Sequence, residues 1–219
     1  MKYQDIRQSL SYASYMESLG WKKEKWQIRN YKLQIYIKRL PILGSFIKIQ
    51  RSPIPIDKSY LKPLAKKYHA FAVEITYSPT KTLRLNLIPS LEKIKSQMKK
   101  DCRYEIRKAE QNNLNVLISQ YLPAEASAQA GPNILISHFI SLWHQNALRR
   151  GFWIPFKKEM LALWQAFDKK AYLVSACHLS PVTCHSLLAG ALILIHDHIA
   201  YYFHAASTPE GRKLSAPIS

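Results

Sequence analysis

A short basic segment, residues 103–108, holds the side chains best suited to bind phosphate. Arg103, Arg107 and Lys108 place three cations within six residues, and Tyr104 lies beside them. Guanidinium groups bind phosphate oxygens bidentately, and a nearby phenol can stack or donate a hydrogen bond. The combination suits a pyrophosphate-bearing nucleotide sugar or the end of an RNA. A solvated helix face accounts for the same residues equally well, so the segment alone leaves both interpretations open.

Cysteines and histidines in the second half of the chain raise the hypothesis of a zinc site. They are Cys177-His178, Cys184-His185, His196, His198 and His204. Their spacing matches neither a CxxC nor an HxxxH pattern, and buried cysteines are common in strands. We therefore interpret them as structural residues and expect no metal.

The basic segment belongs to a long amphipathic helix that Ser90 is expected to open. Apolar residues recur along it at spacings of three and four, which makes one stripe on a 3.6-residue period. They are Leu91, Ile94, Met98, Cys102, Ile106 and Ala109. On this stripe Cys102 is expected to be inert, so it is not assigned as a nucleophile. The other faces are rich in Lys and Arg, and several of these cations are expected to face outward.

The other segments alternate between helical and strand patterns. Helices are predicted to end at Gly20, to span 60–68 and 133–150, and to begin at Pro155. Strands are predicted between 26 and 56 around a Pro41/Gly44 break, and over 71–77, 83–87, 172–179, 187–195 and 199–206. The predicted fold class is α+β (α/β) with antiparallel hairpins.

The composition indicates a globular, strongly basic chain. Its 219 residues are 47% hydrophobic, and 32 Lys and Arg against 14 Asp and Glu give a net charge of +18. Residues 1–115 carry 24 of these cations and 9 of the anions, whereas residues 116–219 carry 8 and 5. This excess favours a polyanionic partner: nucleic acid, an anionic membrane face or a pyrophosphate-bearing substrate. We place a domain boundary near residue 116, close to the linker-like segment 123–132, so that 1–115 and 116–219 form one domain each.

Several protein classes are excluded by what the sequence lacks. Its longest apolar run, 187–195, is far shorter than the ~20 residues of a membrane-spanning helix. The N-terminal residues lack an apolar signal segment and three cysteines are too few for a disulfide framework, so we expect a reducing, cytoplasmic setting. The six glycines form neither GxGxxG nor GxxxxGKS/T, which excludes nucleotide-binding loops of those types.

Segments along the whole chain match, in order, the motifs of one known family. DCRYEIRKAEQ (101–111) is similar to a TRYNIRKAEK helix, and TLRLNL (82–87) to a TLxLDL strand. The other matching segments are Gln8-Ser9 with Gly20-Trp21, LPILGSFIKIQRSP (40–53), ALRRGF (147–152) and AGALILIHDHIAYYFHAASTPEGRKLSAP (189–217). Together they resemble the FemABX family of peptidoglycan bridge-forming aminoacyl(peptidyl)transferases.

The resemblance implies a fold and an activity. The fold would be two acyl-CoA N-acyltransferase-like (GNAT-like) domains, with mixed, largely antiparallel sheets flanked by helices. The activity would move an amino acid from aminoacyl-tRNA to the side-chain amine of the stem peptide in UDP-MurNAc-peptide or lipid II. Such aminolysis depends on positioning and electrostatics and requires no dedicated triad. The donor is aminoacyl-tRNA and no cofactor is expected, while contact with a membrane would be a peripheral attraction of the basic face to anionic lipid.

Matching positions transfer substrate-binding roles to seven residues and a catalytic role to none. They are Arg103, Tyr104, Arg107, Lys108, Arg150, Tyr202 and Ser207. The chain departs from the family at Met16, where relatives often carry a phosphate-binding lysine, and at Asn86, which replaces an aspartate. Relatives also continue beyond the KLxAP motif, so we expect the chain to be cut short and its second domain to be incomplete.

Two other functions stay open at this point. An acyl-CoA-dependent N-acyltransferase would need a Gln/Arg-x-x-Gly-x-Gly/Ala loop after its fourth strand, and residues 207–219 offer only Gly211 there. A non-catalytic RNA-binding protein would use the same basic helix, but no RNP, KH or zinc-knuckle pattern is found.

Overall fold

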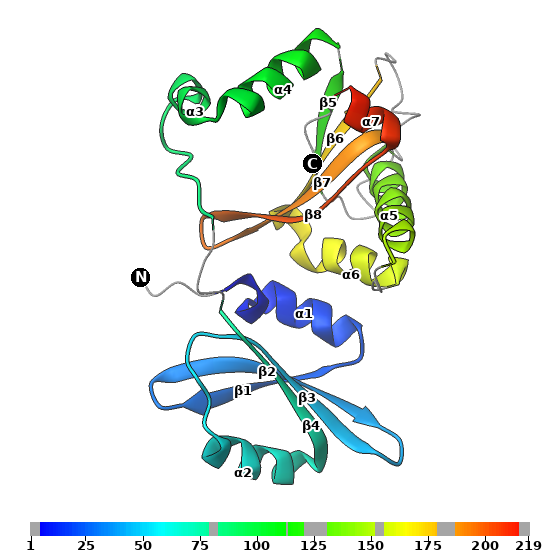
Figure 1. The fold of residues 1–219 in the computed structure, drawn as a ribbon. Coiled ribbons are helices and arrows are strands. Elements are labelled where there is room, and N and C mark those ends of the chain that lie inside the picture. Colours follow the sequence, from blue (N-terminus) through cyan, green and yellow to red (C-terminus); the bar gives the residue numbers. More distant parts are fainter. Residues whose placement is uncertain are drawn as a thin grey trace. The chain divides into compact units, whose positions relative to one another are not determined.

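The chain folds into two compact units, each with a four-stranded sheet of its own (Figure 1). The structure is a computed structural model, and it describes residues 5–78, 83–112, 114–120, 131–151, 156–178 and 187–214. The units are Met1–Leu83 and Arg84–Ser219. The predicted mixed fold, with two largely antiparallel sheets flanked by helices, is confirmed.

The first unit is built around an antiparallel meander with one parallel strand added. Its elements are η1 (Ile6–Gln8), α1 (Leu10–Ser18), β1 (Lys22–Ile28), β2 (Tyr31–Leu40), β3 (Gly44–Ser52), α2 (Lys58–Tyr68) and β4 (Ala70–Tyr77). The strand order is β1-β2-β3-β4, and only the β3–β4 pair is parallel. A parallel pair needs a crossover, which α2 supplies.

Helices cover both faces of this first sheet (Figure 1). Alternate residues of β2 and β3 form one apolar cluster with Leu64 of α2, among them Ile35, Ile37 and Ile47. The intervening Tyr36 is fully buried, and its ring lies 6.2 Å from that of Tyr12 on α1. Burial on both faces explains why the run Leu33 to Ile37 of β2 is continuously buried and does not alternate between buried and exposed residues.

The second unit has a fully antiparallel sheet in the order β5-β6-β7-β8. Its helices are α3 (Leu91–Gln97), α4 (Lys100–Gln111), α5 (Gly131–Arg149), α6 (Lys157–Phe167), η3 (Asp168–Lys170) and α7 (Pro209–Lys213). Its strands are β5 (Asn115–Gln120), β6 (Ala171–Cys177), β7 (Leu187–His196) and β8 (Ile199–Ser207). Helices α5 and α6 correspond to the helices predicted over 133–150 and from Pro155, and β6, β7 and β8 to the strands predicted over 172–179, 187–195 and 199–206.

The core of the second unit lies between the sheet and the helix pair α5 and α6 (Figure 1). Phe139 of α5 and Trp164 of α6 are fully buried, as are Leu173 and Leu192 of the strands. Gly190 on β7 allows this close approach, because a Cβ there would come within 2.6 Å of the Phe139 ring. Packing against Phe139 therefore requires glycine at position 190.

The predicted long helix from Ser90 is wrong, because the chain forms two helices there. Met98 and Lys99 have extended backbones, with ψ of 149° and 151°, and they separate α3 from α4. This break interrupts the predicted apolar stripe, and neither helix buries a residue. Leu91 is 71% exposed, and Cys102, which the sequence placed on the apolar stripe, is exposed as well.

Two further expectations differ from the structure. Residues 83–87, predicted as a strand, have no regular secondary structure, and Leu83 and Leu85 are exposed. The boundary expected near residue 116 falls instead between Leu83 and Arg84. The drop in charge near 116 thus marks a change in surface composition, whereas α4 leads directly into β5 of the second sheet.

Some predicted features lie outside the described residues. They are residues 123–130 of the linker, Phe152, Cys184-His185 and the residues after Leu214. Within the described ranges, no helix is long and apolar enough to cross a membrane.

Candidate functional site

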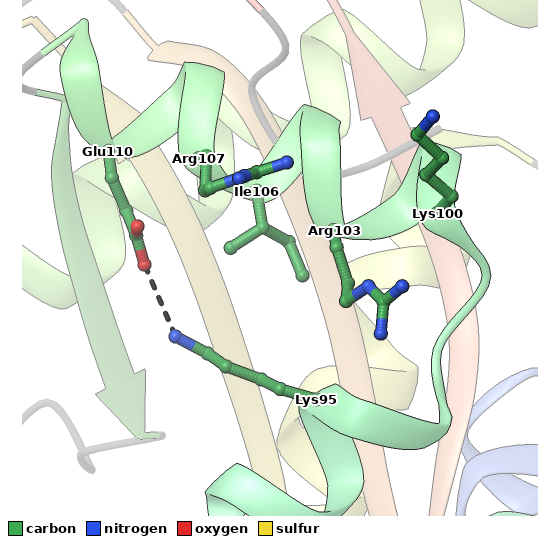
Figure 2. Close-up of a pocket in the computed structure, with 6 residues that line it drawn as sticks. All are labelled: Lys95, Lys100, Arg103, Ile106, Arg107 and Glu110. Atoms are coloured by element: carbon green, nitrogen blue, oxygen red, sulfur yellow. Dashed lines mark hydrogen bonds and ion pairs between the residues drawn. The ribbon is translucent and has the colours of Figure 1, made fainter.

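A groove of about 490 Å³ lies between α3 and α4 (Figure 2). Its lining residues are Lys95, Lys100, Arg103, Ile106, Arg107 and Glu110. Four of these six are cations and one is a carboxylate, so the groove carries a positive charge. Its volume is within the range of small-molecule binding sites.

The sequence builds this groove by combining a helix break with helical periodicity. Ser90 caps the start of α3, where its side-chain oxygen accepts from the Lys93 N–H at 3.4 Å. Beyond the break, Lys100, Arg103 and Arg107 are spaced by three and four residues and therefore share one face of α4. Ile106 and Glu110 extend from the adjoining side of α4 toward Lys95 of α3, whereas the Lys100 side chain extends away from it (Figure 2).

Two contacts between the helices hold the walls of the groove. The Lys95 ammonium lies 3.4 Å from the Glu110 carboxylate, and an Arg103 guanidinium nitrogen donates to the Ser96 carbonyl at 3.1 Å. Lys100 and Arg107 form no ion pair with any described residue. Their N–H groups are therefore available to an anionic ligand.

An apolar hollow of about 170 Å³ adjoins the groove. It is lined by Ile106, Ala109, Glu110, Leu114 and Val116, and it shares Ile106 and Glu110 with the groove. The face of α4 therefore changes from cationic to apolar toward β5. A ligand that carries an anionic group next to an apolar group would fit the cationic groove and the adjoining apolar hollow together.

The structure brings together only part of the predicted basic segment. Arg103 and Arg107 both line the groove. Tyr104, 56% exposed, and the half-buried Lys108 lie on the neighbouring face of α4 and do not line it. Lys100 could have been selected from its spacing to Arg103 and Arg107.

Ser207 belongs to a separate polar group at the end of β8. Its carbonyl accepts from Asn146 of α5 and from Arg212 of α7, both at 2.8 Å. Arg150 follows the same end of α5, where its backbone N–H donates to the Asn146 carbonyl at 3.3 Å. The backbones of Ser207 and Arg150 are thus linked through Asn146, and sequence analysis missed both Asn146 and Arg212.

Tyr202 is not part of that polar group. It lies five residues before Ser207 on β8, about 17 Å along an extended strand, and it is 60% exposed. The register shifts beside its partner Ile193. Partial burial raises the pKa of its phenol above the ordinary value, so the hydroxyl keeps its proton at neutral pH.

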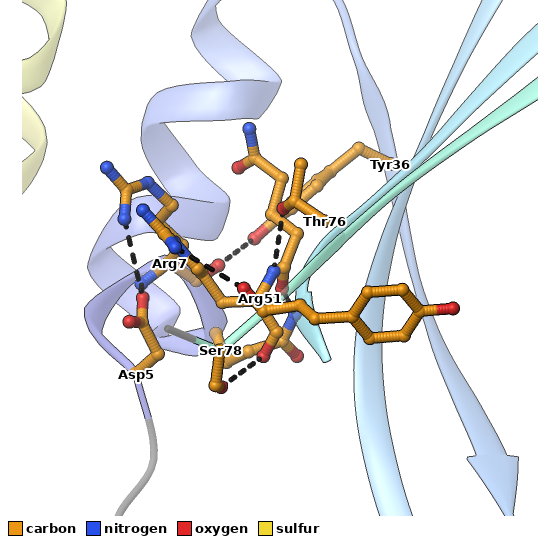
Figure 3. A network of polar contacts seen from close by, with 9 residues as sticks. Asp5, Arg7, Tyr36, Arg51, Thr76 and Ser78 are labelled. Atoms are coloured by element: carbon orange, nitrogen blue, oxygen red, sulfur yellow. Dashed lines mark hydrogen bonds and ion pairs between the residues drawn. The ribbon is translucent and has the colours of Figure 1, made fainter. Parts of the chain in front are cut away.

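In the first unit, several polar groups form a network of hydrogen bonds with one another (Figure 3). The Tyr36 hydroxyl donates to the Arg7 carbonyl at 3.0 Å, and burial raises the pKa of this phenol. The Arg51 N–H donates to Thr76 Oγ1 at 3.0 Å, and the Ser78 hydroxyl donates to the Arg51 carbonyl at 3.3 Å. We therefore assign this network to the stability of the unit.

Within the described ranges, the histidines and the cysteine predicted to be structural have different surroundings. His178 pairs with Glu210 at 2.9 Å on the surface, whereas Cys177 is buried in β6 and is disulfide-bonded. His204 stacks on Trp143, with 4.8 Å between the ring centroids. In the described ranges no three His, Cys, Asp or Glu side chains are placed to hold a metal ion.

Comparison with known proteins identifies a fold. No protein-family model matches the sequence, and no curated protein matches it either. Among solved structures, the chain is similar to "Crystal structure of FemX", with a TM-score of 0.65 over 97% of this chain and 78% of that one. The fold is FemX-like. Sequence identity to FemX is 13%, so this likeness extends to the fold and not to the activity.

Proposed function

We propose that the protein is an aminoacyltransferase of peptidoglycan assembly that acts in the cytoplasm. Its donor would be aminoacyl-tRNA, and its acceptor the side-chain amine of the stem peptide of UDP-MurNAc-peptide or lipid II. The observation that carries the proposal is the cationic groove between α3 and α4 in a FemX-like fold. The motif resemblance of residues 101–111 falls on the helix that forms this groove.

Pyrophosphate is the part of the acceptor that the groove would bind. Its negative charges match the available N–H groups of Lys100 and Arg107, and the Arg107 guanidinium can bind two oxygens at once. Arg103 already donates to the Ser96 carbonyl, so it orients α4 and contributes its remaining donors. Charge-assisted hydrogen bonds of this kind are worth about 1.5–3 kcal/mol each.

The transfer itself would be an ester aminolysis. The neutral amine of the stem peptide attacks the carbonyl carbon of the aminoacyl ester, and the bond from that carbon to the ribose oxygen breaks. An amide forms, and the proton lost by the amine ends on the released ribose hydroxyl. Such a reaction gains most from holding the two substrates in line and from stabilising the oxyanion. We assign Tyr104, Lys108, Arg150, Tyr202 and Ser207 to substrate contacts within this proposal, and no residue to proton transfer.

A transfer assay tests the proposal directly. Radiolabelled aminoacyl-tRNAs are mixed with UDP-MurNAc-pentapeptide, and label in the muropeptide is counted. Calorimetry then measures acceptor binding by the Arg107→Gln variant, for which we expect about tenfold weaker affinity and an unchanged melting temperature. Lys93→Gln is the control, because it removes a cation of α3 that does not line the groove.

The other outcomes point to different functions. Absence of label together with acetylation of an amine from acyl-CoA would make the protein an acyl-CoA-dependent N-acyltransferase. Salt-dependent tRNA binding without consumption of the aminoacyl ester would make it an RNA-binding protein. If the Arg107→Gln variant and the unaltered protein bind the acceptor with equal affinity, the groove is not part of the acceptor-binding site.

A further inference from the structure

The turn between β2 and β3 presents two aliphatic side chains to solvent. Ile42 is fully exposed and Leu43 is 64% exposed. Turns usually place Gly, Asn, Asp or Ser at such positions, because these residues are polar or tolerate unusual backbone angles. Neither aliphatic side chain adds to the core of the first unit, so the fold of this unit does not account for them.

The same turn holds Ile42 in an unfavourable backbone conformation. Its φ is +70°, in the left-handed region that β-branched residues avoid. The Leu43 N–H donates to the Pro41 carbonyl at 2.8 Å, which closes a γ-turn around Ile42. A strained position that projects an apolar side chain into solvent is typical of a functional feature.

An aromatic row begins near the turn, at the start of β3. Phe71, 54% exposed at the start of β4, lies 6.0 Å from Phe46 of β3, and Phe46 lies 6.1 Å from Trp21, measured between ring centroids. The ammonium groups of Lys38 and Lys48 each lie 5.4 Å from the Trp21 ring. Aromatic rings beside lysines are characteristic of the level of lipid headgroups.

Cations also flank the turn. Arg39 precedes it on β2, and Lys66 is in the last turn of α2; both are exposed. The end of α2 lies at the same edge, because the His69 carbonyl accepts from the Ser45 N–H at 3.0 Å. Residues 1–83 carry 16 Lys and Arg against 5 Asp and Glu. A negatively charged surface is therefore attracted to this unit.

We propose that the β2–β3 hairpin docks the first unit on an anionic lipid bilayer. Ile42 and Leu43 enter the interface, the row formed by Trp21, Phe46 and Phe71 lies at the headgroup level, and the flanking cations contact lipid phosphates. A bilayer accounts for the aliphatic side chains, which an RNA would leave in water. It also accounts for the cations, which an apolar protein partner would not need. This docking does not depend on the groove of the second unit.

Vesicle co-sedimentation tests the proposal. The full chain is mixed with vesicles of phosphatidylglycerol and phosphatidylcholine, and separately with vesicles of phosphatidylcholine alone. We expect binding to the mixed vesicles to weaken about tenfold in the Ile42→Asn, Leu43→Ser double variant, because its aliphatic anchors are gone. The melting temperature should be retained or raised, since asparagine tolerates a positive φ.

Leu10→Ser is the matched control, because the Leu10 side chain, on α1 of the same unit, is 68% exposed and so about as exposed to solvent as Leu43. It should leave vesicle binding unchanged. Equal binding of the double variant and the unaltered protein, or equally strong binding to neutral vesicles, would overturn the proposal. Loss of tRNA affinity without loss of vesicle binding would show that the hairpin contacts RNA instead. Transfer to the water-soluble UDP-linked acceptor should be the same in both proteins, so failure of docking and failure of the proposed function are distinguishable.

Discussion

Lys95 and Glu110 join α3 to α4 across the cationic groove, with 3.4 Å between the ammonium nitrogen and the carboxylate oxygen (Figure 2). Their side chains are 53% and 60% exposed, and ion pairs at such positions contribute little to stability. Their main effect is on the electrostatics of the groove, because Glu110 is its one acidic lining residue and occupies one of its cations. A ligand phosphate must compete with this carboxylate.

Replacing Glu110 by glutamine should therefore strengthen anion binding. The change removes a negative charge from the groove and releases Lys95, so we expect UDP-MurNAc-pentapeptide to bind about threefold more tightly. Stability should change by less than about 0.5 kcal/mol, since the pair is exposed. Calorimetric titration measures the affinity. Glu105→Gln makes the same charge change on α4 outside the groove, and an equal gain in that variant would contradict the role of Glu110.

The salt dependence of tRNA binding should report Lys100 and Arg107, which form no ion pair with a described residue, if phosphates of the tRNA acceptor end reach the groove as well as the pyrophosphate. In Lys100→Gln, Arg107→Gln protein, the slope of log affinity against log salt concentration should become shallower by about 1.5, because each phosphate contact contributes about 0.7–0.9. Filter binding over a series of salt concentrations measures this slope. Lys58→Gln, Lys62→Gln protein removes the same charge from α2 of the other unit. An identical slope in both double variants would indicate diffuse attraction by net charge.

Local sequence patterns predicted most of the helices and strands and two of the residues that line the groove. Strand alternation and the Pro41/Gly44 break suffice for the β2–β3 hairpin, because register and turn are local properties. Arg103 and Arg107 were found for the same reason, since helical spacing alone places them on one face.

Tertiary contacts decided what the sequence left open. The break at Met98 and Lys99 carries neither proline nor glycine, so no local signal marks it. Lys95 joins the groove only because that break folds α3 back along α4. Asn146 and Arg212 meet at Ser207 through the packing of α5 and α7 on the second sheet, which residue spacing does not predict.

Acid should weaken the first unit through Glu24. Hydrogen bonds from Lys22 and from the Tyr68 hydroxyl lower the pKa of its carboxyl to about 2, below the ordinary value of 4.5. Because the unfolded chain takes up the proton first, this stabilisation is complete above pH 4.5 and is lost as the pH falls to about 2.

The Glu24→Gln variant isolates this contribution. We expect it to be less stable by about 1 kcal/mol at neutral pH, and the difference should vanish near pH 2. Urea unfolding at the two pH values measures it. Glu17→Gln, which breaks the exposed pair with Lys23, should cost less than about 0.5 kcal/mol. A difference for Glu24→Gln that persists in acid would assign the loss to packing.

Gly190 and Ser175, paired across β6 and β7, should respond to alanine in opposite ways. A Cβ at Gly190 would come within 2.6 Å of Phe139 Cδ2, so Gly190→Ala should cost about 1–3 kcal/mol. The Ser175 hydroxyl is buried and has no hydrogen-bond partner in the described structure, so Ser175→Ala should be neutral or stabilising by about 1 kcal/mol. Thermal unfolding of both variants measures this contrast. Equal destabilisation would mean that any added or removed atom disturbs this sheet, and that the contact between Gly190 and Phe139 is not the cause.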